Sequence, residues 1–149
     1  MPSFSTWIQN TKTRSTASSV LSGLQLARQE AIRNNARVQF QLAGTNGWSV
    51  GCATVTAACP AVIQSKATSS KTPVDVTDGG VTNYVFDNMG YLRVPAIAAG
   101  TNSTAINVSN TVLAAADSRN LRILITSGGL TKMCDPKVTD NTDLRFCQI

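Results

Sequence analysis

Residues 24–38 read LQLARQEAIRNNARV, and this stretch decides how the rest of the chain is arranged. Val20, Leu24, Ala27 and Ala31 recur at helical spacing and so share one face of an α-helix. Arginine and glutamate side chains belong mostly to the other faces. The stretch therefore predicts a helix with one small, apolar face that packs against another layer.

We expect this helix to span roughly residues 3–34. Asn34 and Asn35 form a stop signal, because asparagine tolerates the left-handed conformation at a helix end. Gly23 is a poor helix residue unless something packs closely against it. The beginning of the helix, around Trp7, has no obvious core to contact, and we expect it to fray or project.

After residue 36 the pattern changes to short runs of alternating apolar and polar residues, separated by turn residues. Phe40 and Trp48 fall on such runs and are predicted to lie in the core. The expected strands are residues 38–42, 48–52, 61–65, 72–77, 84–86, 91–94, 105–113, 121–125 and 130–134.

One helix followed by many strands predicts an α+β fold, an N-terminal helix packed on antiparallel β-sheets. The 149 residues suit a single domain, 1–149. Within it, residues 1–35 form the helix and residues 36–149 a β-rich part. We expect two facing sheets, because so many strands need somewhere to bury their alternate faces.

The composition is poor in charge. Charged residues make up 14% of the chain, against about 25% in an average soluble domain. The net charge is nevertheless +5. A basic excess supplies long-range attraction to phosphate and is compatible with DNA binding without requiring it.

The four cysteines form two sequence-local pairs, Cys52 with Cys59 and Cys134 with Cys147. Locality favours these two disulfides among the three possible pairings. With no histidine in the chain and no C-x-x-C spacing, we expect no metal site and no cofactor. Disulfides indicate the periplasm, the cell surface or the medium. Because neither an export signal nor a membrane-spanning run is visible, we expect the chain to be part of a longer exported protein.

Catalysis is not expected. The absence of histidine excludes histidine-based triads and dyads, and no P-loop motif occurs. The acidic pairs, Asp75 with Asp78 and Asp140 with Asp143, fall in loop-like sequence and are interpreted as solvated turn residues. No catalytic residue is therefore assigned.

Residues 24–38 closely resemble the L-x-x-A-R-x-E-A-x-x-x-N-x-x-V stretch of GspH/FimT-type pilins. We assign the helix motif to Leu24, Ala27, Arg28, Glu30, Ala31 and Asn34. Weaker matches follow at residues 47–52 and 84–92, and Pro2 resembles the proline that follows the hydrophobic half of the family's helix.

The resemblance implies a minor pilin of a type IV pilus that helps to assemble or prime the fibre. The full-length protein would be anchored in the bacterial inner membrane, with this domain in the periplasm or on the pilus at the cell surface. Its partners would be other pilin subunits, contacted through the N-terminal helix and Trp7. The alternative is a GspH-like minor pseudopilin of a type II secretion system. The C-terminal disulfide loop favours the pilus.

A second alternative is a minor pilin that binds double-stranded DNA for natural transformation. The family motif linked to DNA capture is G-R-x-R near the C-terminal cysteine, and residues 129–132 here read GLTK. Leu130 replaces the first arginine, and Lys132 can meet a phosphate only as a point charge. The candidate DNA-binding residues are Lys132, Lys137, Arg145, Arg122 and Arg119.

Overall fold

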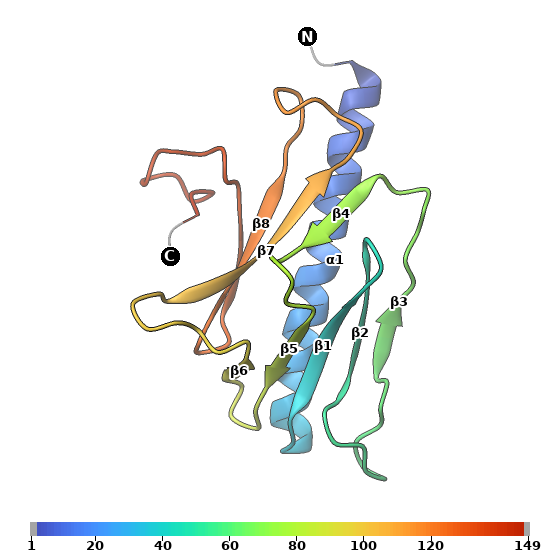
Figure 1. Ribbon diagram of the computed structural model, residues 1–149, viewed down its shortest axis with the longest axis vertical. Coiled ribbons are helices and arrows are strands. Elements are labelled where there is room, and N and C mark those ends of the chain that lie inside the picture. Colours follow the sequence, from blue (N-terminus) through green and yellow to red (C-terminus); the bar gives the residue numbers. More distant parts are fainter. Residues whose placement is uncertain (1–2, 148–149) are drawn as a thin grey trace.

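The computed structural model describes residues 3–147 and shows one long helix lying along a set of short strands (Figure 1). The helix, α1, spans Phe4–Asn34. Ser3 caps its start, where the hydroxyl oxygen accepts the N–H of Thr6 at 3.3 Å. Asn35 ends it in the left-handed conformation, at φ 49°. The predicted helix and its asparagine stop are confirmed, whereas Pro2 lies outside the described residues.

The apolar face of α1 is the one that the spacing predicted. Val20, Leu24, Ala27 and Ala31 are fully buried, and Ala17 extends the same stripe one turn toward the N-terminus. Phe4 and Trp7 are exposed at the projecting upper end of the helix. The helix is continuous from Phe4, so its first turns project without losing helical structure.

Within residues 3–147, nine strands follow the helix and form two antiparallel sheets. The first sheet has the order β3-β2-β1-β5-β6 and the second the order β4-β7-β8-β9. The strands are β1 (Val38–Ala43), β2 (Gly47–Cys52), β3 (Gln64–Lys66), β4 (Val74–Thr77), β5 (Asn83–Phe86), β6 (Leu92–Val94), β7 (Ser103–Asn110), β8 (Leu121–Thr126) and β9 (Thr131–Cys134).

Some predicted strand ends were wrong because side chains bond to nearby backbone. The strand expected over residues 105–113 ends at Asn110, whose Oδ1 accepts the N–H groups of Val112 and Leu113 and turns the chain. The strand expected from residue 91 begins at Leu92, because the Asp87 carboxylate accepts the N–H of Tyr91. These local bonds compete with the sheet for the same backbone groups.

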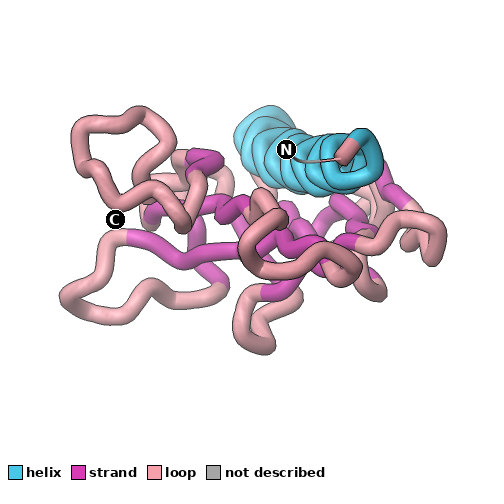
Figure 2. Tube along the Cα trace, turned by 90° about the horizontal axis from the view of Figure 1, so that it is seen from above, coloured by secondary structure: helices cyan, strands magenta, loops and turns pink. Residues whose placement is uncertain are grey.

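The expectation of two facing sheets was wrong. Strands of both sheets lie in a layer on one side of α1 (Figure 2), and the helix contacts β1, β2 and β5 of one sheet and β7, β8 and β9 of the other. Two backbone hydrogen bonds join the sheets, from Leu92 N–H to Ser127 O at 3.0 Å and from Val76 N–H to Thr45 O at 2.8 Å. A single helix therefore covers both sheets.

Aromatic side chains fill the first sheet beneath the helix. Phe40 packs against Trp48 and Tyr84, with ring centroids 5.7 and 6.3 Å apart. The Trp48 Nε1–H donates to Ser19 Oγ at 3.0 Å, which satisfies the one polar group of that ring. Both predicted core aromatics, Phe40 and Trp48, are buried. Gly23 lies directly above these two rings.

Two disulfides close local loops, Cys52–Cys59 and Cys134–Cys147. The first closes the turn after β2. The second ties the end of β9 to the C-terminal loop. Of the described residues between Cys134 and Cys147, Asp135 alone is buried. The disulfide is therefore a major attachment of that loop.

We expect Gly23→Ala to destabilise the protein. A Cβ at Gly23 would lie 2.6 Å from Phe40 Cε2 and 3.1 Å from the Trp48 ring. Overpacking of this kind costs about 1–3 kcal/mol in free energy of unfolding. At an exposed helix position the same change would stabilise by up to about 1 kcal/mol. Urea denaturation measures the sign of the change in free energy of unfolding. The variant Ser18→Ala, on the exposed face of the helix, is the control. A more stable variant would contradict the packing described here.

We expect the double variant Cys134→Ser, Cys147→Ser to loosen residues 135–146 before any other part of the chain. Closing a loop of about 15 residues is worth about 3 kcal/mol in the chain-entropy model. Relative to the wild-type protein, hydrogen exchange in the variant should accelerate more in residues 135–146 than in β7 and β8. The matched variant Cys52→Ser, Cys59→Ser should leave residues 135–146 protected. Equal acceleration along the whole chain would refute a local role for this disulfide.

Candidate functional site

The helix-motif residues are structural in this protein. Leu24, Ala27 and Ala31 form the buried face of α1. Arg28 reaches away from the helix, and its Nε–H donates to the carbonyl oxygen of Gly90 at 3.1 Å. A Cβ at Gly90 would lie 3.0 Å from Arg28 Nε, and one at Gly129 would lie 2.9 Å from it. Both distances are shorter than an ordinary van der Waals contact, so the two glycines leave room for the arginine side chain. The sequence did not indicate this partner.

The remaining motif residues build the end of the helix. Glu30 forms an ion pair with Arg33 at 3.1 Å and also accepts from Asn34 Nδ2 at 3.0 Å. The asparagine of the family pattern aligns with Asn35 and not with the assigned Asn34. Asn35 caps the helix, and its Oδ1 accepts from Asn88 Nδ2 at 2.9 Å. These bonds connect the helix end to the β5–β6 turn.

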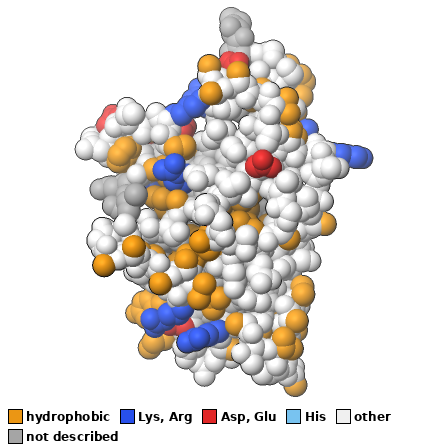
Figure 3. Space-filling model, in the orientation of Figure 1, with side chains coloured by type: hydrophobic (Ala, Val, Ile, Leu, Met, Phe, Trp, Pro, Cys, Tyr) orange, Lys and Arg blue, Asp and Glu red, His pale blue; other side chains and the backbone are white. Residues whose placement is uncertain are grey.

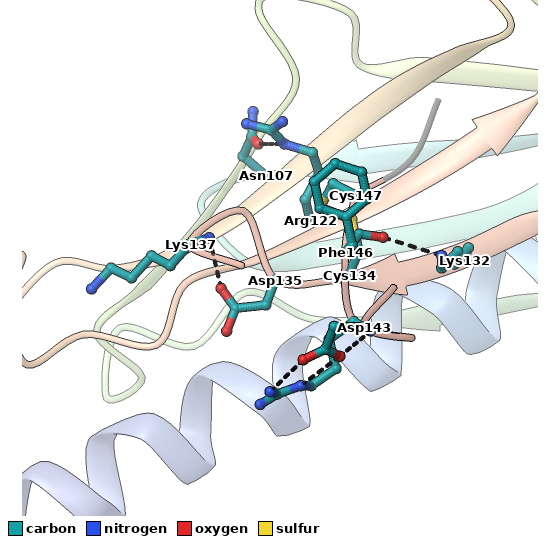
Figure 4. The surroundings of a disulfide bond; sticks show 10 residues. Asn107, Arg122, Lys132, Cys134, Asp135, Lys137, Asp143, Phe146 and Cys147 are labelled. Atoms are coloured by element: carbon teal, nitrogen blue, oxygen red, sulfur yellow. Dashed lines mark hydrogen bonds and ion pairs between the residues drawn. A yellow bond between two sulfur atoms is a disulfide. The ribbon is translucent and has the colours of Figure 1, made fainter. Parts of the chain in front are cut away.

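The two lysines predicted around the second disulfide bond to backbone carbonyl oxygens of the protein itself. The Lys132 ammonium donates to the carbonyl oxygen of Phe146 at 3.1 Å (Figure 4). The Lys137 ammonium donates to the carbonyl oxygens of Ala115 and Ser118, the latter at 2.6 Å. Both lysines therefore hold the C-terminal loop against other parts of the chain.

The three arginines of the prediction are divided between two places. Arg122 lies on β8, where its Nε–H donates to Asn107 Oδ1 on β7 at 2.9 Å (Figure 4). Arg119 and Arg145 instead line a groove of about 470 Å³ between α1, the start of β8 and the C-terminal loop. The structure thus places Arg119 and Arg145 in one groove, while Lys137 and Lys132 bond to the neighbouring residues Ser118 and Phe146.

Sequence reasoning missed the helix side of this groove. Trp7, Asn10, Thr11 and Arg14 line it from α1. Their spacing places them on one helix face, which was the signal available in the sequence. We call this site the arginine groove and define it by Trp7, Arg14, Arg119, Leu121, Met133 and Arg145.

Asn10 holds the groove together across more than a hundred residues of sequence. Its Nδ2–H donates to Asp117 O at 3.0 Å, and its Oδ1 accepts the N–H of Arg119 at 2.8 Å. The Lys137 ammonium bonds to the same turn from the C-terminal loop. The backbone that carries Arg119 is therefore fixed from two sides.

The charges of the groove are unequally compensated. Arg145 forms a bidentate pair with Asp143, at 3.2 and 2.8 Å. The side-chain hydrogen bonds from Arg145 lower the pKa of the Asp143 carboxyl to about 2, so this pair stays ionised in mild acid. Within residues 3–147, neither Arg14 nor Arg119 forms an ion pair.

The described part of the chain contains no group of three or more histidine, cysteine, aspartate or glutamate side chains that could hold a metal ion. Within residues 3–147, no helix combines the length and the apolar character that crossing a membrane requires.

Comparison with known proteins gives a consistent result. The family model described as type II transport protein GspH matches residues 16–129, which is more than half of the chain. The comparison of this chain with curated proteins found no match. Among solved structures, the chain is similar to the type IV minor pilin FimU of Pseudomonas aeruginosa strain PAO1. A crystal form in space group P21 has a TM-score of 0.67 and 14% identity, over 90% of this chain and 99% of the FimU chain.

A second crystal form of FimU, in space group P65, has a TM-score of 0.59 and 16% identity, over 85% of this chain and 99% of the FimU chain. At this identity the likeness shows the fold, a helix packed on antiparallel sheets. The family is shown by the sequence model. The chain therefore belongs to the GspH family and has the type IV pilin-like fold expected of GspH/FimT pilins.

Proposed function

We propose that the full-length protein is a minor pilin of a type IV pilus that contributes to pilus assembly or priming. The observation that carries this proposal is the similarity to FimU, a type IV minor pilin, over 90% of this chain and nearly all of the FimU chain. Members of the family and of the fold are structural proteins. We assign no catalytic role.

The partners in this proposal are other pilin subunits, contacted through the N-terminal helix. Phe4 and Trp7 support this assignment, because their rings stack with centroids 5.7 Å apart and are 75% and 62% exposed. Two exposed aromatics at one helix end offer apolar area that a neighbouring chain can bury. We propose that the full-length protein is anchored in the bacterial inner membrane and enters the pilus at the cell surface.

The alternative is a GspH-like minor pseudopilin of a type II secretion system. The matching family model carries that description, so family membership is compatible with both systems. The C-terminal loop closed by Cys134–Cys147 favours the pilus.

A deletion in the bacterium that encodes the protein separates these two systems. We expect loss or strong reduction of surface pili, with export of type II secretion substrates unchanged. Electron microscopy counts the pili, and the exported proteins are measured in the medium. The full-length gene should restore pili. Unchanged pili with impaired export would support the pseudopilin instead.

Double-stranded DNA is a second proposed partner. The motivation is the net charge of +5 and the resemblance to transformation pilins. The bonds of Lys132 and Lys137 to carbonyl oxygens reduce the number of cations free to meet phosphates. Binding through so few phosphates should be weak, with a Kd of about 10⁻⁴–10⁻⁶ M, and independent of base sequence.

A mobility-shift titration at low salt tests this second partner. We expect a shift that fades with added salt and weakens in Lys132→Ala and Arg145→Ala. Leu130 is 63% exposed, so Leu130→Arg places a guanidinium in solvent and should strengthen binding. No shift at high protein concentration would reject DNA binding. A shift that neither alanine variant changes would reject these residues as its site.

A further inference from the structure

We infer that the arginine groove binds an acidic segment of another polypeptide, with carboxylates on Arg14 and Arg119 and an apolar side chain over Leu121 and Met133. The choice of a polypeptide rests on the proposed function, in which the protein assembles with other subunits. The chemistry rests on the groove itself. Figure 3 shows basic side chains beside the upper part of α1 and near the C-terminal loop.

Charge is the first argument. Arg14 reaches the groove from α1 and Arg119 from the turn before β8, and both side chains are exposed without an ion pair in residues 3–147. Asp143 neutralises Arg145 on the loop side, and Asp135 is the one carboxylate among the lining residues. Asp135 already accepts the N–H of Lys137 at 2.9 Å. Two guanidinium groups thus remain for a ligand, and their planar forks match carboxylates.

Preorganisation is the second argument. The two bonds of Asn10 and the bond of Lys137 hold the Arg119 turn against α1 and the C-terminal loop. Arg14 stands on a continuous helix. The backbone that carries each arginine is therefore fixed before a ligand arrives, so that binding has to order the two side chains but not the chain segments that bear them.

The lining of the groove favours a peptide over nucleic acid. Leu121 and Met133 are half-buried and pack against the core, so they present apolar surface to the groove. A volume of about 470 Å³ lies in the range of pockets that bind small molecules, roughly 300–1,000 Å³, so the groove offers room for a few side chains of a ligand. A peptide supplies carboxylates and apolar side chains together, whereas a DNA duplex presents mainly phosphates to such a site.

The test uses a fluorescein-labelled heptapeptide with two glutamates flanking a leucine, titrated with the protein at moderate salt. Fluorescence anisotropy should show saturable binding. The double variant Arg14→Ala, Arg119→Ala should lower the affinity at least tenfold. The variant Arg37→Ala, Lys71→Ala removes two exposed charges elsewhere and should lower it less than twofold. Circular dichroism verifies that each variant is folded.

Three results would overturn the inference. The first is an equal loss of affinity in the two double variants, which would mean attraction by net charge alone. The second is equal binding of a control peptide with glutamines in place of the glutamates. The third is that a labelled oligothymidylate binds more tightly than the peptide, displaces it and loses affinity in the Arg14→Ala, Arg119→Ala variant. A base could then stack on Trp7, and the groove would be a nucleic-acid site.

The pH dependence of peptide binding is an independent test of carboxylate recognition. The peptide glutamates protonate near pH 4.3, so binding should be lost as the pH falls from 5 to 3.5. The charged groups that face the ligand are the arginines Arg14, Arg119 and Arg145 and the carboxylate of Asp135. The pKa of Asp143 is lowered to about 2 by its hydrogen bonds from Arg145, so that pair does not release Arg145 in this range. Binding that strengthens over this interval would contradict carboxylate recognition.

The peptide titration is independent of pilus formation. A groove that fails to bind the peptide leaves the minor-pilin proposal intact, because deletion of the gene tests that separately. Conversely, a protein with no effect on pili can still bind the acidic peptide through Arg14 and Arg119. The two proposals therefore fail on different measurements.

Discussion

The contact between the buried stripe of α1 and the two sheets is the constraint on which the rest of the structure depends. Each sheet has α1 as the layer over its inner face. Small residues along the stripe, Ala17, Gly23, Ala27 and Ala31, allow the strands to approach the helix axis, and the aromatic pair Phe40 and Trp48 fills the space beneath Gly23. Because protein interiors are close-packed, a larger side chain on this stripe would affect both sheets at once.

Much of this arrangement could be predicted from the sequence, because periodicity reports burial directly. The spacing of Val20, Leu24, Ala27 and Ala31 identified the helix face, and the alternation around Phe40 and Trp48 identified core strands. The relation between the sheets could not be predicted. Alternation shows that one face of a strand is buried, but it does not show whether a sheet or a helix covers that face.

The site was harder to predict because its residues are far apart in sequence. Arg119 and Arg145 were singled out for their charge, but Lys132 and Lys137 lie in the same region of sequence and bond to backbone carbonyls. Charge alone does not distinguish a cation that holds a loop from one that is free to meet a ligand. Arg14 and Trp7 became part of the site through the turn before β8, which Asn10 holds against α1, and through the C-terminal loop that carries Arg145.

The two disulfides have a mechanical consequence. Their half-cystines are 7 and 13 residues apart, so neither connects α1 to a sheet or one sheet to the other. A chain pulled along its helix would carry the tension through the peptide connection at residues 35–37 and through the non-covalent packing of the helix on the sheets. That load runs parallel to the stripe and is shared in shear by contacts from Thr13 to Ala31, so that many contacts must yield together. The cross-linked loops would keep their shape under such a pull, and the extensible parts of the chain would be the remaining connections between strands.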